Sequence, residues 1–328
     1  MEPRLVPLNV AIGLTVRGDL NAPVLSDAGY QLSGLEVPMQ TPAGTVVIDA
    51  VIASGATGHI LVCEAKSGAN VEIEQARRYG QLDPIAIAQS SFITLQAKPY
   101  VEPVYVCLAQ NTGRIVQGLE EAELACGVLA VGRDRIVLER PELASDALRQ
   151  VFAEPVQLGA PPPRIVPFDH ESPAEQIRRH VQAALVALLA RRVPQVSLRA
   201  LAEEAAPQFG LWNRRVQGSV VRKVGEAARA IANGDPATFE YHPAAANRDG
   251  LVRFLRTPED NDPRGRTQAY QALARGPRRR RRGVAEDPDQ LGFDLDLLRG
   301  LDGQGTGSDT VSRRKDDGDE EVTHDDAR

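Results

Sequence analysis

The residues best suited to chemistry lie between Gly44 and Leu82, where the pattern predicts a strand, a turn, a second strand and a helix. The acid Asp49 interrupts one apolar run, and Glu64 and Lys66 end the next. Both runs are apolar at odd and even positions, which is typical of central strands covered on both faces. A carboxylate there is costly unless a positive charge pairs with it. A metal ion held by Asp49 and Glu64 would supply that charge.

The turn between the two runs decides whether these side chains meet. Ser54 to Gly58 has loop composition, so the flanking strands are expected to form an antiparallel hairpin. One register pairs Ser54 with His59. In that register Asp49 lies directly opposite Glu64, and a slip by two residues still keeps them on one face. A slip by one residue would send Asp49 to the opposite face.

Two carboxylates on one face suit a hard divalent cation such as Mg²⁺, or Mn²⁺ in its place, because such ions take oxygen ligands and keep several waters. The neighbouring Lys66 can orient or help to deprotonate an attacking water and can offset phosphate charge. This combination predicts metal-assisted hydrolysis of a phosphodiester.

These residues resemble the PD-(D/E)xK nuclease superfamily, in which an acid on one strand precedes acid-x-Lys on the next. Here the acid is Asp49, preceded by Ile48 in place of the signature proline, and Glu64-Ala65-Lys66 follows. The next helix carries Gln75-Ala-Arg-Arg-Tyr79, which is similar to the Q-x-x-x-Y motif of the recombination-nuclease branch. Its two ends share one helical face.

The resemblance covers roughly residues 35–109 and implies a restriction-endonuclease-like mixed α/β core. It implies metal ligation by Asp49 and Glu64. It implies catalytic roles for Asp49, Glu64, Lys66, Gln75 and Tyr79. A helix before the first strand often adds an acid in this superfamily, and the candidates here are Asp19, Asp27 and Glu36.

A simpler interpretation remains for each motif. Glu64 and Lys66 would then be a solvated pair on an edge strand, and Asp49 an acid facing a turn. Gln75 and Tyr79 would lie on an ordinary helix surface.

The remaining elements of the first half are expected from periodicity. We expect a short helix from Ala22 to Leu32 and a first strand from Leu35 to Met39. A second helix is expected from Asn70 to about Leu82, with Asn70 as its N-cap. Further strands are expected at 103–109, 127–131 and 135–139. A helix is expected at 141–152, with Leu143, Ala147, Leu148 and Val151 facing inward.

Composition bounds the class of protein. The chain has 328 residues, 42% hydrophobic and 25% charged, which is typical of globular proteins. Cys63, Cys107 and Cys126 lie in apolar runs and read as buried reduced thiols, so we expect a cytoplasmic protein. The apolar run 181–190 is too short to span a bilayer, and the start lacks a signal-peptide pattern, so no membrane association is expected.

A proline run at 159–163 separates two regions of different character. Ser172 and Glu175 have the spacing of a capping box, and apolar stripes follow on three successive helices. A hairpin at 238–241 and 251–255 closes the region. Three helices and a hairpin resemble a winged helix. The expected domains are a nuclease-like domain at 1–158, a proline-rich linker at 159–171, a winged-helix-like domain at 172–256 and a disordered charged tail at 257–328.

The third of these helices is basic enough to enter a DNA major groove. The expected DNA contacts are Arg214, Arg215, Arg222, Lys223 and Arg248. The alternative is that this helix contacts a second copy of the chain or a partner protein. Five arginines at 278–282 would attract phosphates or pair with the acidic tail.

The sequence therefore predicts a metal-dependent DNA endonuclease with DNA as its partner, acting in restriction, phage defence or a mobile element. A homodimer or a partner protein of a defence or transposition system fits the same layout, which resembles the endonuclease subunits of some heteromeric transposases. The alternative is a non-catalytic DNA-binding or adaptor protein in which the nuclease-like core is a scaffold.

Overall fold

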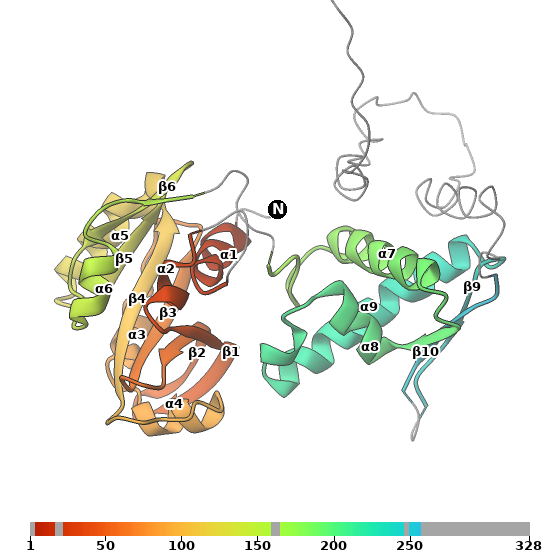
Figure 1. The fold of residues 1–328 in the computed structure, drawn as a ribbon, viewed down its shortest axis with the longest axis horizontal. Helices are drawn as coiled ribbons and strands as arrows, with labels where there is room; N and C mark the ends of the chain where they lie inside the picture. Colours follow the sequence, from red (N-terminus) through yellow and green to blue (C-terminus); the bar gives the residue numbers. More distant parts are fainter. Residues whose placement is uncertain (1–3, 17–21, 159–164, 246–248, 257–328) are drawn as a thin grey trace, which may run out of the picture. The chain divides into compact units, whose positions relative to one another are not determined.

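The computed structural model contains two sheets, each with its own helices (Figure 1). The first is a seven-stranded mixed sheet, and the second is a three-stranded antiparallel sheet. The mixed α/β class expected from the sequence is confirmed. The structure describes residues 4–16, 22–158, 165–245 and 249–256.

The strands of the larger sheet lie in chain order, β1 to β7. The β3, β4 and β5 strands run parallel to one another, and the other neighbours are antiparallel. The strands are β1 (Gln31–Thr41), β2 (Gly44–Ser54), β3 (His59–Lys66), β4 (Tyr100–Leu108), β5 (Gly127–Val131), β6 (Arg135–Arg140) and β7 (Val156–Gln157).

The β2–β3 hairpin has the register that brings the acids together. Ser54 pairs with His59, and the pairing continues to Ala50 and Cys63. The expected antiparallel hairpin is therefore confirmed, with the first of the two favourable registers.

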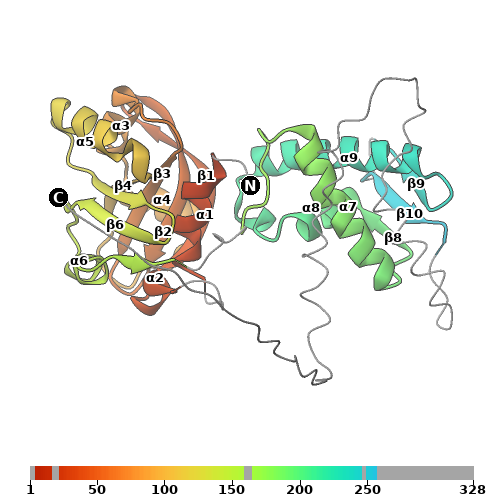
Figure 2. The ribbon, with the colours of Figure 1, turned by 90° about the horizontal axis from the view of Figure 1, so that it is seen from above.

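Helices cover both faces of this sheet, as the doubly apolar strands require (Figure 2). The first group packs on the face of Val62 and Tyr105, and the second on the face of Leu61 and Val104. The first group is α3 (Ile73–Tyr79), α4 (Pro84–Ser90) and α5 (Thr112–Glu121). The second group is α1 (Leu5–Gly13), α2 (Val24–Asp27) and α6 (Asp146–Val151).

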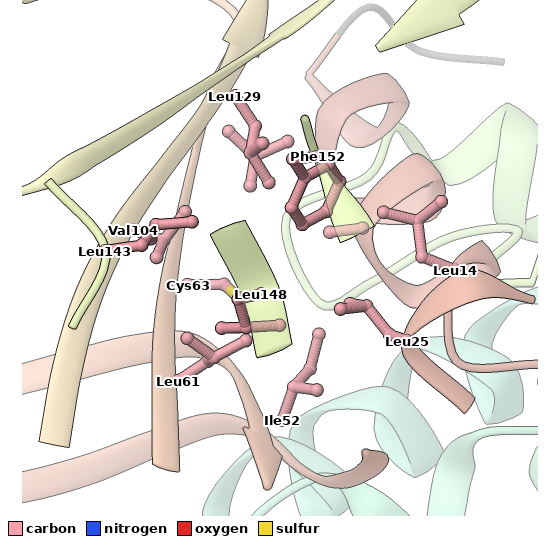
Figure 3. Close-up of a pocket in the computed structure, with 12 residues that line it drawn as sticks. Leu14, Leu25, Ile52, Leu61, Cys63, Val104, Leu129, Leu143, Leu148 and Phe152 are labelled. Carbon is pink, nitrogen blue, oxygen red and sulfur yellow. The ribbon is translucent and has the colours of Figure 1, made fainter. Parts of the chain in front are cut away.

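The second face contains a small apolar cavity of about 20 Å³ (Figure 3). Side chains from the α1, α2 and α6 regions and from the four strands β2 to β5 surround it, among them Leu14, Leu25, Leu61, Cys63 and Phe152. Its lining is wholly apolar, so the opposite face of β3 from Glu64 is ordinary core.

Several expected boundaries in this half are wrong. The helix expected from Asn70 begins at Ile73, and Glu72 occupies its N-cap position. The helix expected over 141–152 is only α6, and Ala147 is exposed on it. Three helices were not expected, α1, α4 and α5. The helix expected over 22–32 is only α2, because residues 31 and 32 belong to β1. The α4 helix begins at the Asp83-Pro84 pair, where the Asp83 side chain accepts a hydrogen bond from the Ile85 N–H.

The C-terminal region folds as three helices around a small sheet of order β8-β10-β9. The expected inward stripes are buried, from Ile177 on the first helix to Ile231 on the third. The hairpin is also confirmed. The elements are α7 (Ala174–Ala190), β8 (Gln195–Ser197), α8 (Leu198–Ala205), α9 (Arg214–Gly234), β9 (Phe239–His242) and β10 (Leu251–Phe254).

The helix starts in this region are set by short polar side chains. Ser197 and Asn213 cap α8 and α9 by accepting backbone N–H groups. The expected capping box at Ser172 is wrong, because its hydroxyl bonds to Asp169 and Pro173 occupies the N-cap position without a side-chain bond. Short 3₁₀ turns lie at Ala109–Asn111 and Phe209–Leu211.

Some expectations fall on residues outside the described ranges. They concern Asp19, Arg248, the arginine run at 278–282 and the charged tail at 257–328. Among the described residues, none of the helices combines the length and the apolarity that a bilayer span requires.

Candidate metal centre

Asp49 and Glu64 come together because of the hairpin register. Continuing the pairing one step beyond Ala50 and Cys63 places Asp49 opposite Glu64. Glu64 is only 3% exposed, and Asp49 is partly buried. The backbone N–H of Ala65 donates to an Asp49 carboxylate oxygen at 2.7 Å, which fixes that side chain against β3.

Lys66 supplies the positive charge nearest to these acids. Its Nζ lies 2.8 Å from Oε1 of Glu64 and 3.2 Å from Oε1 of Glu72 at the start of α3. The Lys66 side chain is 16% exposed, whereas that of Glu72 is 71% exposed. Lys66 therefore bridges a buried carboxylate and a solvated one.

Gln75 and Tyr79 of α3 hold the other oxygen of Glu64. The Tyr79 hydroxyl donates to Oε2 of Glu64, and the Gln75 amide donates to the same oxygen at 3.2 Å. Gln75 also donates to the Tyr79 oxygen at 2.9 Å. Their four-residue spacing therefore serves to orient Glu64, and all five side chains expected at the site converge.

Burial and the excess of carboxylates at the site raise the pKa values of Asp49 and Tyr79. Burial, with the nearby charge of Glu64, raises the pKa of Asp49 to about 8, against the smaller opposing effects of the Ala65 N–H and Lys66. Burial and the charge of Glu64 also raise the pKa of Tyr79 far above its ordinary range. Asp49 thus holds a proton at neutral pH that a cation would displace.

Glu36 is the candidate for an additional acid that, among the described residues, acts electrostatically on Asp49. It lies on β1 between residues paired with Ala50 and Ile48, and its φ of 48° is unusual for a residue with a side chain. Burial, and then the charges of Asp169 and Glu171, raise the pKa of Glu36 to about 7. A Glu36 carboxylate oxygen lies 3.0 Å from Nδ1 of His170.

These residues fit a divalent cation through two carboxylates. Among the described residues, no three His, Cys, Asp or Glu side chains converge as a complete ligand set. Mg²⁺ accepts such a site because it commonly takes one or two carboxylates and completes its shell with water and phosphate oxygens. The raised pKa of Asp49 marks the place where a positive charge would be accommodated.

The basic residues of α9 form a separate candidate interface. Arg214, Arg215, Arg222 and Arg229 are exposed, and seven-residue spacing places the last three on one face. Glu226 shares that face and lies 3.7 Å from Arg222. Lys223 differs from the others, because it is partly buried and donates to the backbone carbonyl of Ser172 at 3.4 Å.

Two residues near the site were not expected from the sequence. One is Glu72, which pairs with Lys66. The other is Tyr105. Tyr105 of β4 pairs directly with Glu64 and is fully buried. Its signal in the sequence is weak, since a tyrosine in an apolar strand reads as core. Only the parallel pairing of β3 with β4 brings it to the acids.

Comparison with known proteins gives one match. Residues 6–164 match the family model described as the MJECL32 domain, which corresponds to the region of the seven-stranded sheet. No curated protein and no solved structure matches the chain. The match groups the sheet and its helices together, and its description names no activity.

Proposed function

We propose that the seven-stranded region is a Mg²⁺- or Mn²⁺-dependent nuclease of the PD-(D/E)xK type that hydrolyses phosphodiester bonds in DNA. The observation that carries the proposal is the convergence of Asp49, Glu64 and Lys66 with Gln75 and Tyr79. Lys66, Gln75 and Tyr79 all contact the Glu64 carboxylate, and the Asp49 carboxylate is bonded to the next residue of β3, Ala65. An unrelated set of surface residues would not converge in this way.

The chain's own groups have distinct parts in this chemistry. The Ala65 N–H and the Tyr79 hydroxyl hold the carboxylates of Asp49 and Glu64 in fixed orientations. Lys66 stands beside Glu64, where its ammonium can hydrogen-bond to an attacking water or a phosphate oxygen. A bound cation supplies Lewis acidity and lowers the pKa of water.

The proposal continues with the C-terminal region as a winged helix that binds duplex DNA. Arg215, Arg222 and Arg229 line one exposed face of α9, and Asn213 caps its N-terminus. An exposed basic helix of this length fits the major groove. The β9–β10 hairpin follows the third helix in the chain, and this order supports the proposal of a winged helix.

A second candidate is a non-catalytic DNA-binding protein with a nuclease-like scaffold. The observation that favours it is the set of contacts to Glu64, whose two oxygens already receive Lys66, Gln75 and Tyr79. In this view the acids and the lysine form only an internal network.

Cleavage of supercoiled plasmid by the full chain separates the two candidates. The nuclease predicts nicking with Mg²⁺ or Mn²⁺ and none with chelator, and loss of nicking in Lys66→Met. Absence of nicking under all metal conditions, on plasmid, linear and single-stranded DNA alike, would favour the scaffold.

DNA binding is tested separately by charge-matched variants of the full chain. Arg222→Ala with Arg229→Ala should weaken binding and flatten the dependence of log affinity on log salt, by up to about 0.9 for each phosphate that is no longer neutralised. The control removes two exposed arginines of the larger sheet, Arg133 and Arg135, with the same change in net charge. Equal reductions of affinity in both variants would exclude a specific interface on α9.

A further inference from the structure

Tyr105 has an unusual position beside the candidate metal centre. The register pairs it with Glu64 across β3 and β4, and its side chain is fully buried. Its hydroxyl oxygen is also buried, and it has no hydrogen-bond partner among the residues that the structure describes. A buried hydroxyl normally has a partner, because burial without one costs free energy.

The two ends of the Tyr105 side chain meet different surroundings. Its ring belongs to an apolar cluster formed by Ala76, Cys107, Ile115, Leu119, Cys126 and Val128. Burial, and then the charge of Glu64, raise the pKa of Tyr105 above its ordinary range, with smaller effects of Glu72 and Asp49. The hydroxyl is therefore a donor without a partner among the described residues, and it belongs to the residue that pairs with Glu64 on the neighbouring strand.

The oxygens of Glu64 already receive donors from other residues. Oε2 of Glu64 receives Tyr79 and Gln75, and Oε1 receives Lys66. An additional oxygen within hydrogen-bonding distance of the Tyr105 hydroxyl would satisfy it. A hydrated divalent cation brings such oxygens, because Mg²⁺ retains several waters when two carboxylates bind it.

We propose that Tyr105 is a positioning residue of the candidate metal centre, whose hydroxyl donates a hydrogen bond to a water that hydrates the cation held by Asp49 and Glu64. This inference rests on the proposed nuclease site. It assigns to Tyr105 the role of orienting that water and of stabilising the loaded state. In the metal-free protein the same hydroxyl lowers the stability of the fold, because it is buried without a hydrogen-bond partner among the described residues.

The proposal predicts that Tyr105→Phe does not destabilise the metal-free protein but weakens metal binding. With chelator, the variant should have a melting temperature equal to or above that of the wild type, because it loses only an unpaired hydroxyl. With Mn²⁺, its affinity by titration calorimetry should fall about tenfold or more, as for other residues that orient metal-bound groups. Both measurements use the full chain and the metal alone.

Tyr30→Phe is the matched control. Tyr30 is 1% exposed, but its hydroxyl lies 2.7 Å from Nδ1 of His59 and 3.3 Å from Oγ of Ser145. This variant should lower the melting temperature with chelator and leave Mn²⁺ affinity unchanged. If Tyr105→Phe behaves in the same way, Tyr105 is a structural residue and the proposal is overturned.

Asp49→Asn separates failure of this inference from failure of the proposed function. If the wild type binds Mn²⁺ and Asp49→Asn does not, the metal centre stands, and unchanged affinity in Tyr105→Phe rejects only the role of Tyr105. If the wild type binds no Mn²⁺, or Asp49→Asn binds it equally well, both the metal centre and the role of Tyr105 are rejected.

Discussion

The β3 strand carries a buried polar cluster at each end, and the two clusters differ in the number of carboxylates for each basic side chain. At the first end, Nε2 of His59 lies 2.8 Å from a Glu102 oxygen, and Nδ1 lies 2.7 Å from the Tyr30 hydroxyl. The Tyr100 ring stacks on the imidazole at a centroid distance of 4.3 Å, and Glu102 also accepts the Ala144 N–H. One imidazole therefore serves one carboxylate.

At the other end two carboxylates share one ammonium. Asp49 and Glu64 face Lys66, which is divided between Glu64 and the exposed Glu72. The pKa of Asp49 is raised, and the hydroxyl of Tyr105 is unpaired among the described residues. Burial and polarity are common to both clusters, so they do not mark a functional site. The excess of carboxylates over basic side chains does, because folding alone gives no reason for it.

The largest expected effect is on cleavage. Asp49→Asn and Glu64→Gln should each lower the rate of plasmid nicking by at least about 10³-fold, roughly 4 kcal/mol of transition-state stabilisation. Duplex DNA affinity should change little, since the proposed contacts lie on α9. Full nicking activity in either variant would place the chemistry elsewhere.

The second effect tests the balanced cluster. His59→Ala removes the imidazole that lies beside Glu102 and the Tyr30 hydroxyl and leaves these buried groups without it, which should lower the free energy of unfolding by about 1–3 kcal/mol for each group. Urea unfolding measures this change. Nicking below the unfolding transition should continue, and its disappearance in a folded His59→Ala protein would show that the two ends of β3 are coupled.

The third effect reverses the sign of the second. Without metal, Asp49→Asn should raise the free energy of unfolding at pH 7 by on the order of 1–3 kcal/mol. The folded-state pKa of about 8 lies above the ordinary value of 3.8, so ionised Asp49 destabilises the fold. The advantage of the variant should be absent near pH 3, grow as the pH rises from about 4 to 8, and then level off.

Asp169 provides the control for that experiment. Burial would raise its pKa, but the hydrogen bond and charge of Arg4, with the Glu171 N–H and the Ser172 hydroxyl, lower it overall. Asp169→Asn should therefore destabilise the protein at pH 7, and its deficit should vanish as the pH falls below the ordinary aspartate range. Destabilisation by Asp49→Asn at pH 7 would contradict the contrast between the two acids.

The sequence predicted the hairpin and its acids well for a physical reason. Side-chain alternation and turn length fix which residues of an antiparallel pair share a face, so Asp49 and Glu64 could be placed from local information. The burial of the apolar stripes on α7, α8 and α9 follows from equally local periodicity. The same reasoning failed at Ser172, because Asp169 competes for its hydroxyl.

Long-range neighbours could not be predicted in this way. Tyr105 meets Glu64 through a parallel pairing across the intervening α3 and α4, and parallel register leaves no trace in turn chemistry. His59 and Glu102 are likewise joined across β3 and β4. The α1 helix could not be predicted for a different reason. It has apolar residues on all sides, so it lacks the amphipathic stripe that identifies a helix.

The smallest expected effect concerns the apolar face of β3, between the two polar clusters. Cys63→Val should fill the cavity of about 20 Å³ shown in Figure 3. At about 24 cal/mol per Å³, the free energy of unfolding should rise by about 0.5 kcal/mol. Nicking should not change, because this side chain and Glu64 lie on opposite faces. Cys107→Val is the control. Cys107 is fully buried, its Sγ lies 3.5 Å from the Thr112 hydroxyl, and it does not line that cavity. Added volume there should lower the free energy of unfolding by about 1–3 kcal/mol. A folded Cys63→Val protein with impaired nicking would show that packing beneath β3 sets the position of its acids, and the contrast would then lie between strand faces as well as strand ends.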